Sequence, residues 1–140
     1  MSRKIFLTLA SIVTIGVGLF ALSVPAILLD SKGAAGSAAA DVWVREIGIA
    51  LISIGIVAFG VRGHADSPTL RTFLFGNAIL QLGLFTIEVV AYAQGVITKV
   101  SGIIPNAIVH VLLFCGFMYY ATSRNTDSNH QTEKLLHSAK

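Results

Sequence analysis

Residues 70–94 form an apolar stretch that contains side chains capable of hydrogen bonding and acid–base chemistry. In a helix, Asn77, Gln81 and Glu88 lie on one face, because residues three or four positions apart are neighbours there. Tyr92 follows Glu88 by one turn on the same face. A carboxylate inside hydrocarbon costs about 3 kcal/mol or more unless it is paired, solvated or protonated. We therefore expect other polar side chains to face Glu88.

Two other apolar stretches carry polar side chains at a comparable depth. Arg45 and Glu46 lie one turn inside the second stretch. Asn106 and His110 lie one turn apart in the fourth. At about 1.5 Å per residue, antiparallel helices bring these side chains to the height of Glu88. The sequence thus predicts a polar pocket in the outer half of a helix bundle, with Arg45 as the partner of Glu88. The candidate ligand or proton site comprises Glu88, Arg45, His110, Asn106, Tyr92 and Glu46.

Structural roles are the alternative interpretation of these polar residues. Asn77 and Gln81 lie deeper in the third stretch, and we expect them to make only interhelical polar contacts. Arg45 and Glu46 can instead extend to the outer head groups. Glu88 can belong to a purely structural ion pair, and the polar side chains of the fourth stretch can join helices by hydrogen bonds.

The composition indicates a membrane protein. Of the 140 residues, 54% are hydrophobic and 12% are charged, whereas soluble domains carry about a quarter charged residues. The charges are separated by four apolar stretches of roughly the 20 residues that cross a bilayer. We predict an all-α fold, an antiparallel bundle of four transmembrane helices at about residues 5–29, 42–61, 72–93 and 103–121. Residues 122–140 are predicted to be a polar, disordered cytoplasmic tail.

The basic residues predict the orientation of this bundle. Arg45, Lys32 and Lys99 belong to one side, and the other seven belong to the side of the termini: Arg3, Lys4, Arg62, Arg71, Arg124, Lys134 and Lys140. By the positive-inside rule, both termini are cytoplasmic and the protein lies in the plasma (inner) membrane. The net charge of +3 is too small and too scattered to indicate nucleic-acid binding. The first stretch is longer than the apolar region of a signal peptide, which favours a retained helix over cleavage near residues 23–26.

Small residues predict where two of the helices pack closely. Ala10, Thr14 and Gly18 recur every four residues in the first stretch. Gly48 and Gly55 are seven residues apart and share a face of the second. Such stripes allow two helix backbones to approach one another.

The helix ends are predicted from capping residues and prolines. Asp41, Ser67 and Ser101 are the expected N-caps of the second, third and fourth helices. Pro25 is expected to kink the last turns of the first helix. Pro105 is tolerable only in the first turn of the fourth helix.

The motifs of several enzyme and cofactor classes are absent from the sequence. There is no HExxH sequence, no Cys/His pair at zinc spacing and no phosphate-binding glycine loop. Glu88 and His110 supply only two metal ligands, which disfavours a metal, and a haem ligated by His110 has no further support. Cys115 is the single cysteine, so an intramolecular disulfide is excluded, and a packing role is expected. A quinone remains compatible with a polar pocket in apolar surroundings.

Short motifs resemble the DoxX-like family of small bacterial four-helix membrane proteins. They are an uncharged first stretch ending near Pro25, an Arg–Glu-x-Gly start to the second (residues 45–48), and a Ser–Pro turn followed by Arg71. The resemblance implies a compact four-helix bundle. It also implies, from some members, a link to quinone-dependent or oxidase-associated membrane complexes.

Three functions are compatible with the polar pocket. The favoured one is a membrane binding or accessory protein for a quinone or lipid-like ligand, or a subunit of a larger membrane complex. Its partners are the lipid bilayer and either other membrane subunits or further copies of the chain. The alternatives are a small proton-coupled transporter that uses Glu88 in an oligomer, and a membrane enzyme that acts on a lipophilic substrate at Glu88 and His110.

Overall fold

The computed structural model describes residues 1–123, which form five α-helices and no strand. The helices are α1 (Arg3–Ser23), α2 (Pro25–Lys32), α3 (Ala38–Val61), α4 (Pro68–Ala93) and α5 (Val100–Thr122). Within these residues the predicted all-α fold class is confirmed. Four of the helices, α1, α3, α4 and α5, are long and apolar enough to cross a membrane. The predicted tail lies outside the described residues beyond position 123.

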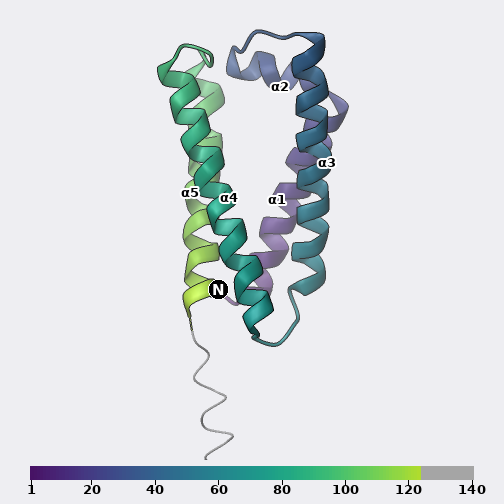
Figure 1. The fold of residues 1–140 in the computed structure, drawn as a ribbon, viewed down its shortest axis with the longest axis vertical. Helices are drawn as coiled ribbons and strands as arrows, with labels where there is room; N and C mark the ends of the chain where they lie inside the picture. Colours follow the sequence, from purple (N-terminus) through teal and green to yellow (C-terminus); the bar gives the residue numbers. More distant parts are fainter. Residues whose placement is uncertain (124–140) are drawn as a thin grey trace, which may run out of the picture.

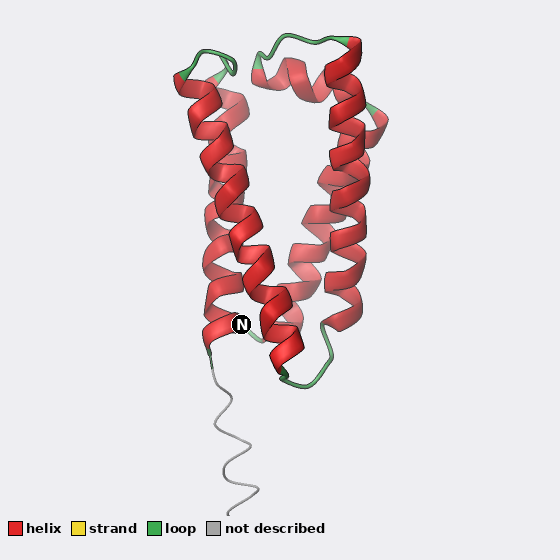
Figure 2. Cartoon of the chain, in the orientation of Figure 1, coloured by secondary structure: helices red, strands yellow, loops and turns green. Residues whose placement is uncertain are grey.

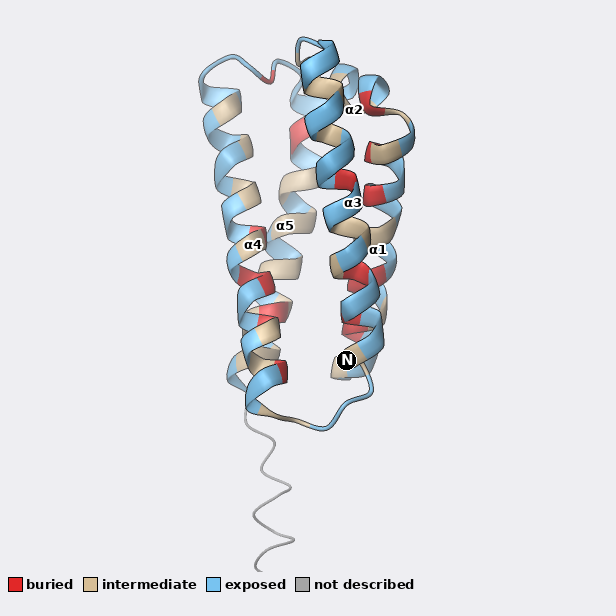
Figure 3. Ribbon diagram, turned by 45° about the vertical axis from the view of Figure 1, so that its right-hand side comes forward, coloured by how far each residue is buried: buried red, intermediate tan, exposed pale blue. Residues whose placement is uncertain are grey.

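The long helices are arranged as two pairs, α1 with α3 and α4 with α5 (Figures 1 and 2). The N-terminus, the α3–α4 turn and the end of α5 lie together at the terminal end, at the bottom of Figure 1. The short helix α2 and the α4–α5 loop lie at the opposite end, which we call the α2 end. Buried positions gather where helices face one another, and the outer surfaces are largely exposed (Figure 3).

The two pairs are joined by an apolar core near the terminal end. Leu7 of α1 and Leu74 and Ala78 of α4 are each fully buried there. The ring of Phe6 meets the ring of Phe117 of α5 edge to face, with centroids 5.0 Å apart. These contacts close the space between the pairs in the terminal half of the molecule.

Glycines bring α1 and α3 into backbone contact. A Cβ atom added at Gly18 would lie 2.7 Å from the carbonyl oxygen of Gly48, and one at Gly48 would lie 2.8 Å from that of Gly18. A Cβ atom at Gly55 would lie 3.2 Å from the carbonyl oxygen of Ser11. The close packing predicted at Gly18, Gly48 and Gly55 is therefore confirmed. The rest of the stripe predicted on α1 is wrong, because Ser11 rather than Thr14 faces Gly55, and Thr14 lines the cavity described below.

The predicted first span, residues 5–29, is wrong as a single helix. It breaks at Val24, whose φ of −136° is not helical, and Pro25 starts the separate helix α2. The reason is that proline lacks an amide hydrogen, clashes with the preceding turn and drives the residue before it out of helical geometry. As a result α2 turns inward and contacts α5 as well as α1 (Figure 1).

Backbone hydrogen bonds hold the end of α2 against the α4–α5 loop. The amide groups of Thr98 and Lys99 both donate to the carbonyl oxygen of Lys32 at 3.1 Å. Gly33 ends α2 with a φ of +65°, a left-handed conformation that favours glycine. The conformation of this junction fixes the position of Lys32.

Two of the predicted caps and one proline position are also wrong. Ser37 rather than Asp41 caps α3, because alanines 38–40 extend that helix outward. Lys99 rather than Ser101 precedes α5, and Pro105 lies beyond the first turn of that helix. The prediction for α4 is confirmed: the Ser67 side chain accepts a hydrogen bond from the Leu70 amide.

Candidate functional site

A chain of polar side chains runs along the α4–α5 interface, starting at α2. Lys32 of α2 forms an ion pair with Oε1 of Glu88 on α4. The side-chain amide of Asn106 on α5 donates to the same oxygen at 2.6 Å. The Glu88 and Lys32 side chains are only 13% and 16% exposed, which explains why the carboxylate takes two donors.

The chain continues from Asn106 to His110 and Gln81. Nδ2 of Asn106 lies 3.2 Å from Nε2 of His110, and Nδ1 of His110 lies 2.6 Å from Oε1 of Gln81. The direction of each bond follows from the amide nitrogen of Asn106, which can only donate. Asn106 must then present its amide hydrogens, so Nε2 of His110 accepts and Nδ1 donates to Gln81. The hydrogen bonds thus assign a neutral His110 with its proton on Nδ1.

These five side chains line one cavity between the two helix pairs. Its volume is about 220 Å³, and it lies in the half of the molecule nearer to α2. The wall opposite the polar chain is apolar and includes Val17 of α1 and Ile47 and Leu51 of α3. The site therefore combines hydrogen-bonding groups on one side with hydrocarbon on the other.

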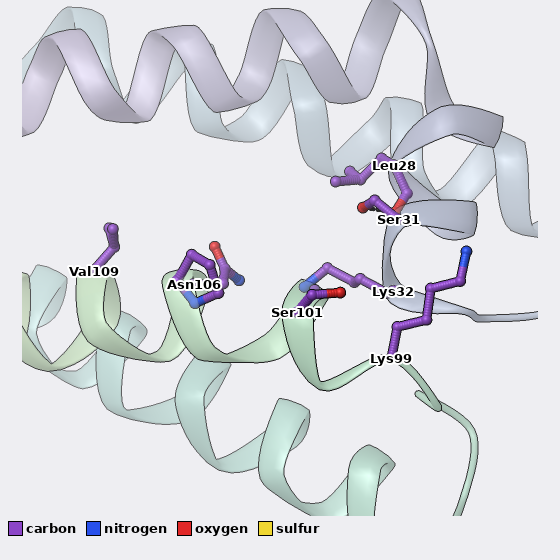
Figure 4. A pocket seen from close by; sticks show the side chains of 9 residues that line it. Leu28, Ser31, Lys32, Lys99, Ser101, Asn106 and Val109 are labelled. Carbon is purple, nitrogen blue, oxygen red and sulfur yellow. Dashed lines mark hydrogen bonds between the residues drawn. The ribbon is translucent and has the colours of Figure 1, made fainter.

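A second pocket, of about 560 Å³, adjoins the cavity at the α2 end. Both hollows are lined by Leu28, Lys32, Asn106 and Val109. In Figure 4, Lys32 extends from α2 towards α5, where Ser101 and Asn106 lie. The ion pair and Asn106 therefore lie between the cavity and the outer surface of this end.

The second oxygen of Glu88 has an unmet hydrogen-bonding capacity. Its Oε2 is buried and accepts no hydrogen bond from any described residue. Nε2 of His110 lies 4.0 Å from Oε2, beyond hydrogen-bond distance, and already accepts from Asn106. Leaving a buried acceptor without a donor costs about 1–3 kcal/mol, and more for a charged group. A ligand with a hydroxyl, phenol or amide donor would remove this cost.

The predicted partner of Glu88 is wrong. Arg45 is exposed on α3 and forms no ion pair with Glu88, whose partner is Lys32. Glu46 is also exposed, Tyr92 is 43% exposed, and none of these three residues lines the cavity. The structure therefore groups Glu88 with Asn106 and His110 as predicted, and leaves out the other three candidates.

Sequence reasoning missed the roles of Lys32 and Gln81. From the sequence, Lys32 contributes only to the predicted orientation, although Pro25 and Gly33 delimit a short helix that carries it inward. Gln81 was assigned to interhelical contact alone. It does make such a contact, but with His110, and it lines the cavity.

Asn77 remains outside the polar chain. It is buried, and its amide donates to the carbonyl oxygen of Phe73 in its own helix at 2.9 Å. Among residues 1–123, the Asn77 side chain therefore makes its hydrogen bond within α4 and not to another helix. In residues 1–123, no three His, Cys, Asp or Glu side chains are grouped so that they could hold a metal ion.

Comparisons of the chain with protein-family models, with curated proteins and with solved structures found no match. The resemblance to the DoxX-like family therefore stays a prediction. The functional argument rests on the chain's own geometry.

Proposed function

We propose that this chain is an integral membrane binding or accessory protein whose cavity takes a lipophilic molecule with a hydrogen-bond-donating head group, such as the quinol form of a quinone or a lipid-like compound. Large apolar side chains on all four long helices support membrane insertion. Ile12, Ile56, Ile79 and Leu112 are 61%, 58%, 56% and 65% exposed. Such surfaces are favourable against lipid and costly against water. The basic residues near the terminal end favour a plasma-membrane orientation with cytoplasmic termini.

The buried, unpartnered Oε2 of Glu88 is the observation that carries this proposal. A head group in the cavity would meet Oε2 as an acceptor, with the amide of Asn106 and the imidazole of His110 beside it. The hydrocarbon part of the ligand would pack against the apolar wall from α1 and α3. The adjoining outer pocket offers a route for the head group.

The same geometry favours binding over transport. Below Gln81, the core around Leu7, Leu74 and Ala78 is fully buried and apolar. A proton or polar solute on the Glu88 side would meet this core before it reached the terminal end. The row of polar side chains is therefore better suited to bind a head group than to conduct protons or polar solutes across the membrane.

The test is quinol binding by the purified protein in mild detergent under reducing conditions, with a short-chain ubiquinol analogue, whose hydroxyl groups can donate to Oε2, as the probe. Lipophilic molecules that co-purify are identified by mass spectrometry. We expect saturable binding that Glu88→Gln weakens about tenfold, since a hydrogen bond to a charged group is worth about 1.5–3 kcal/mol. We expect Leu51→Trp, which fills the cavity from the opposite wall, to abolish binding.

Matched control variants distinguish a loss of binding at the cavity from general effects of removing a charge or adding a large ring. Glu46→Gln removes the same charge from an exposed position on α3, and Ile49→Trp adds the same ring on an exposed face. Both should bind like the wild type. The binding proposal is overturned if no quinol or co-purifying lipid binds saturably, or if Glu46→Gln weakens binding as much as Glu88→Gln.

A further inference from the structure

A basic pocket lies at the terminal end, away from the cavity. Its volume is about 480 Å³, and its lining comes from the start of α1, the α3–α4 turn and the end of α5. The residues that give it chemical character are Arg3, Lys4, Arg62, His64, Tyr119 and Tyr120. No acidic residue lines it within the part of the chain that the structure describes.

The walls of this pocket are held in place by contacts that cross between elements. Arg3 donates to the carbonyl oxygen of His64 at 2.6 Å, which fastens α1 to the α3–α4 turn. The Tyr120 hydroxyl donates to the carbonyl oxygen of Met1, which fastens α5 to the start of the chain. The guanidinium carbon of Arg62 lies 3.4 Å from the centre of the Phe59 ring. The pocket is therefore formed before any ligand arrives.

The positive charge of the pocket is only partly balanced. Arg3 lies 3.5 Å from Asp66, which also binds Arg71. For Lys4 and Arg62, no carboxylate of residues 1–123 comes within ion-pair distance. Nε of Arg3 is in addition a buried donor without an acceptor in this part of the chain. Guanidinium and ammonium groups in such an arrangement match the oxygens of a phosphate.

We propose that this pocket binds the phosphate group of an anionic phospholipid from the leaflet at the terminal end. Tyr119, which is 63% exposed, lies beside the pocket as aromatic side chains do at a membrane interface. Basic pockets between transmembrane helices on the cytoplasmic side are suited to anionic head groups. This site requires membrane insertion but not a ligand in the cavity near Glu88.

The test is lipid binding by the detergent-solubilised full chain, measured by native mass spectrometry. Phosphatidylglycerol and phosphatidylcholine with identical acyl chains are titrated separately. We expect phosphatidylglycerol to bind about tenfold more tightly, and the Lys4→Gln, Arg62→Gln double variant to lose that preference. Lys4→Gln alone, at an exposed position, should reduce the preference by a smaller factor.

The control variant also removes one arginine and one lysine charge, but from the α2 end of the molecule. The Arg45→Gln, Lys99→Gln variant should keep the full preference for phosphatidylglycerol. Glycerol 3-phosphate, added at the same concentration as the lipid, should not displace it if the lipid is the true ligand. Equal binding of the two lipids, an equal loss in the control variant, or displacement by glycerol 3-phosphate would each overturn the proposal.

Discussion

The α1–α3 and α4–α5 interfaces join helices of similar length by different chemistry. Between α1 and α3, Gly18 and Gly48 let the backbones touch, and the contact is made by small and apolar groups. Between α4 and α5, side-chain hydrogen bonds cross the interface from Glu88 to Asn106 and from Gln81 to His110. Glycines do not serve the same purpose in α4, where a Cβ atom on Gly76 or Gly83 would meet nothing within 4 Å.

The different chemistry of the two interfaces indicates that they have different roles, one in stability and the other in ligand binding. Packing alone holds α1 to α3, so substitutions in the glycine contacts between them should act through the stability of the fold. The α4–α5 interface places charged and polar groups where apolar ones would join the helices at lower cost. Those groups line the cavity, which lies where the two helix pairs separate. The polar interface is therefore the better candidate for ligand chemistry.

The largest effect should come from breaking the α1–α3 interface with Gly48→Leu. The new side chain would collide with the Gly18 carbonyl oxygen and the backbone of Leu22, forcing the helices apart. We expect a loss of about 3 kcal/mol or more in the free energy of unfolding, measured by denaturant titration in mixed micelles.

Gly16→Leu is the matched control for this substitution. A Cβ atom at Gly16 would meet nothing within 4 Å. The control should unfold at the same denaturant concentration as the wild type or at a slightly higher one, because leucine favours the helical conformation more than glycine does. Equal destabilisation by both variants would contradict the claim that backbone contact holds this interface together.

A smaller effect is expected at the polar interface from Lys32→Met. Among the described residues, the substitution leaves Asn106 as the only hydrogen-bond donor to the Glu88 carboxylate, and the Glu88 side chain is only 13% exposed. We expect a loss of about 2 kcal/mol in the free energy of unfolding. Adding Glu88→Gln should recover part of that loss, because it removes the unpaired charge.

Lys99→Met tests whether this result is specific to a buried pair. Lys99 pairs with Asp30 at 3.2 Å, but these side chains are 49% and 84% exposed. Exposed pairs contribute about 0–1 kcal/mol, so the control should unfold close to the wild type. If Lys32→Met lowers the free energy of unfolding no more than Lys99→Met does, the ion pair between Lys32 and Glu88 does not stabilise the fold.

The sequence was sufficient for the features that depend on local pattern. Long apolar stretches predicted the four long helices, and the spacing of Gly18, Gly48 and Gly55 predicted their close packing. The rise per residue of a helix also predicted that Asn106 and His110 lie at the height of Glu88, and hydrogen bonds link the three side chains there. These properties follow from helix geometry alone.

The partner of Glu88 could not be obtained in this way. Depth alone pointed to Arg45, the basic residue one turn inside the second apolar stretch. The choice depended on the break at Pro25 and on the backbone bonds that hold Lys32 against the α4–α5 loop. Those bonds join residues more than 60 positions apart, so no local pattern encodes them. The same is true of Gln81, whose role depends on which face of α5 meets α4.

The smallest expected effect tests the turn that connects the two interfaces. Hydrogen bonds from Arg71, helped by the charge of Arg3, lower the pKa of the Asp66 carboxyl below its ordinary value despite partial burial. A lowered folded-state pKa means that the carboxylate stabilises the fold fully above about pH 4 and loses this contribution as the pH falls through the lowered value. Asp66→Asn should therefore destabilise the protein at pH 7 by less than about 1 kcal/mol. Thermal unfolding of both proteins between pH 7 and pH 2.5 should show this difference shrinking towards zero, whereas a difference that stays constant would exclude the ion pairs as its source.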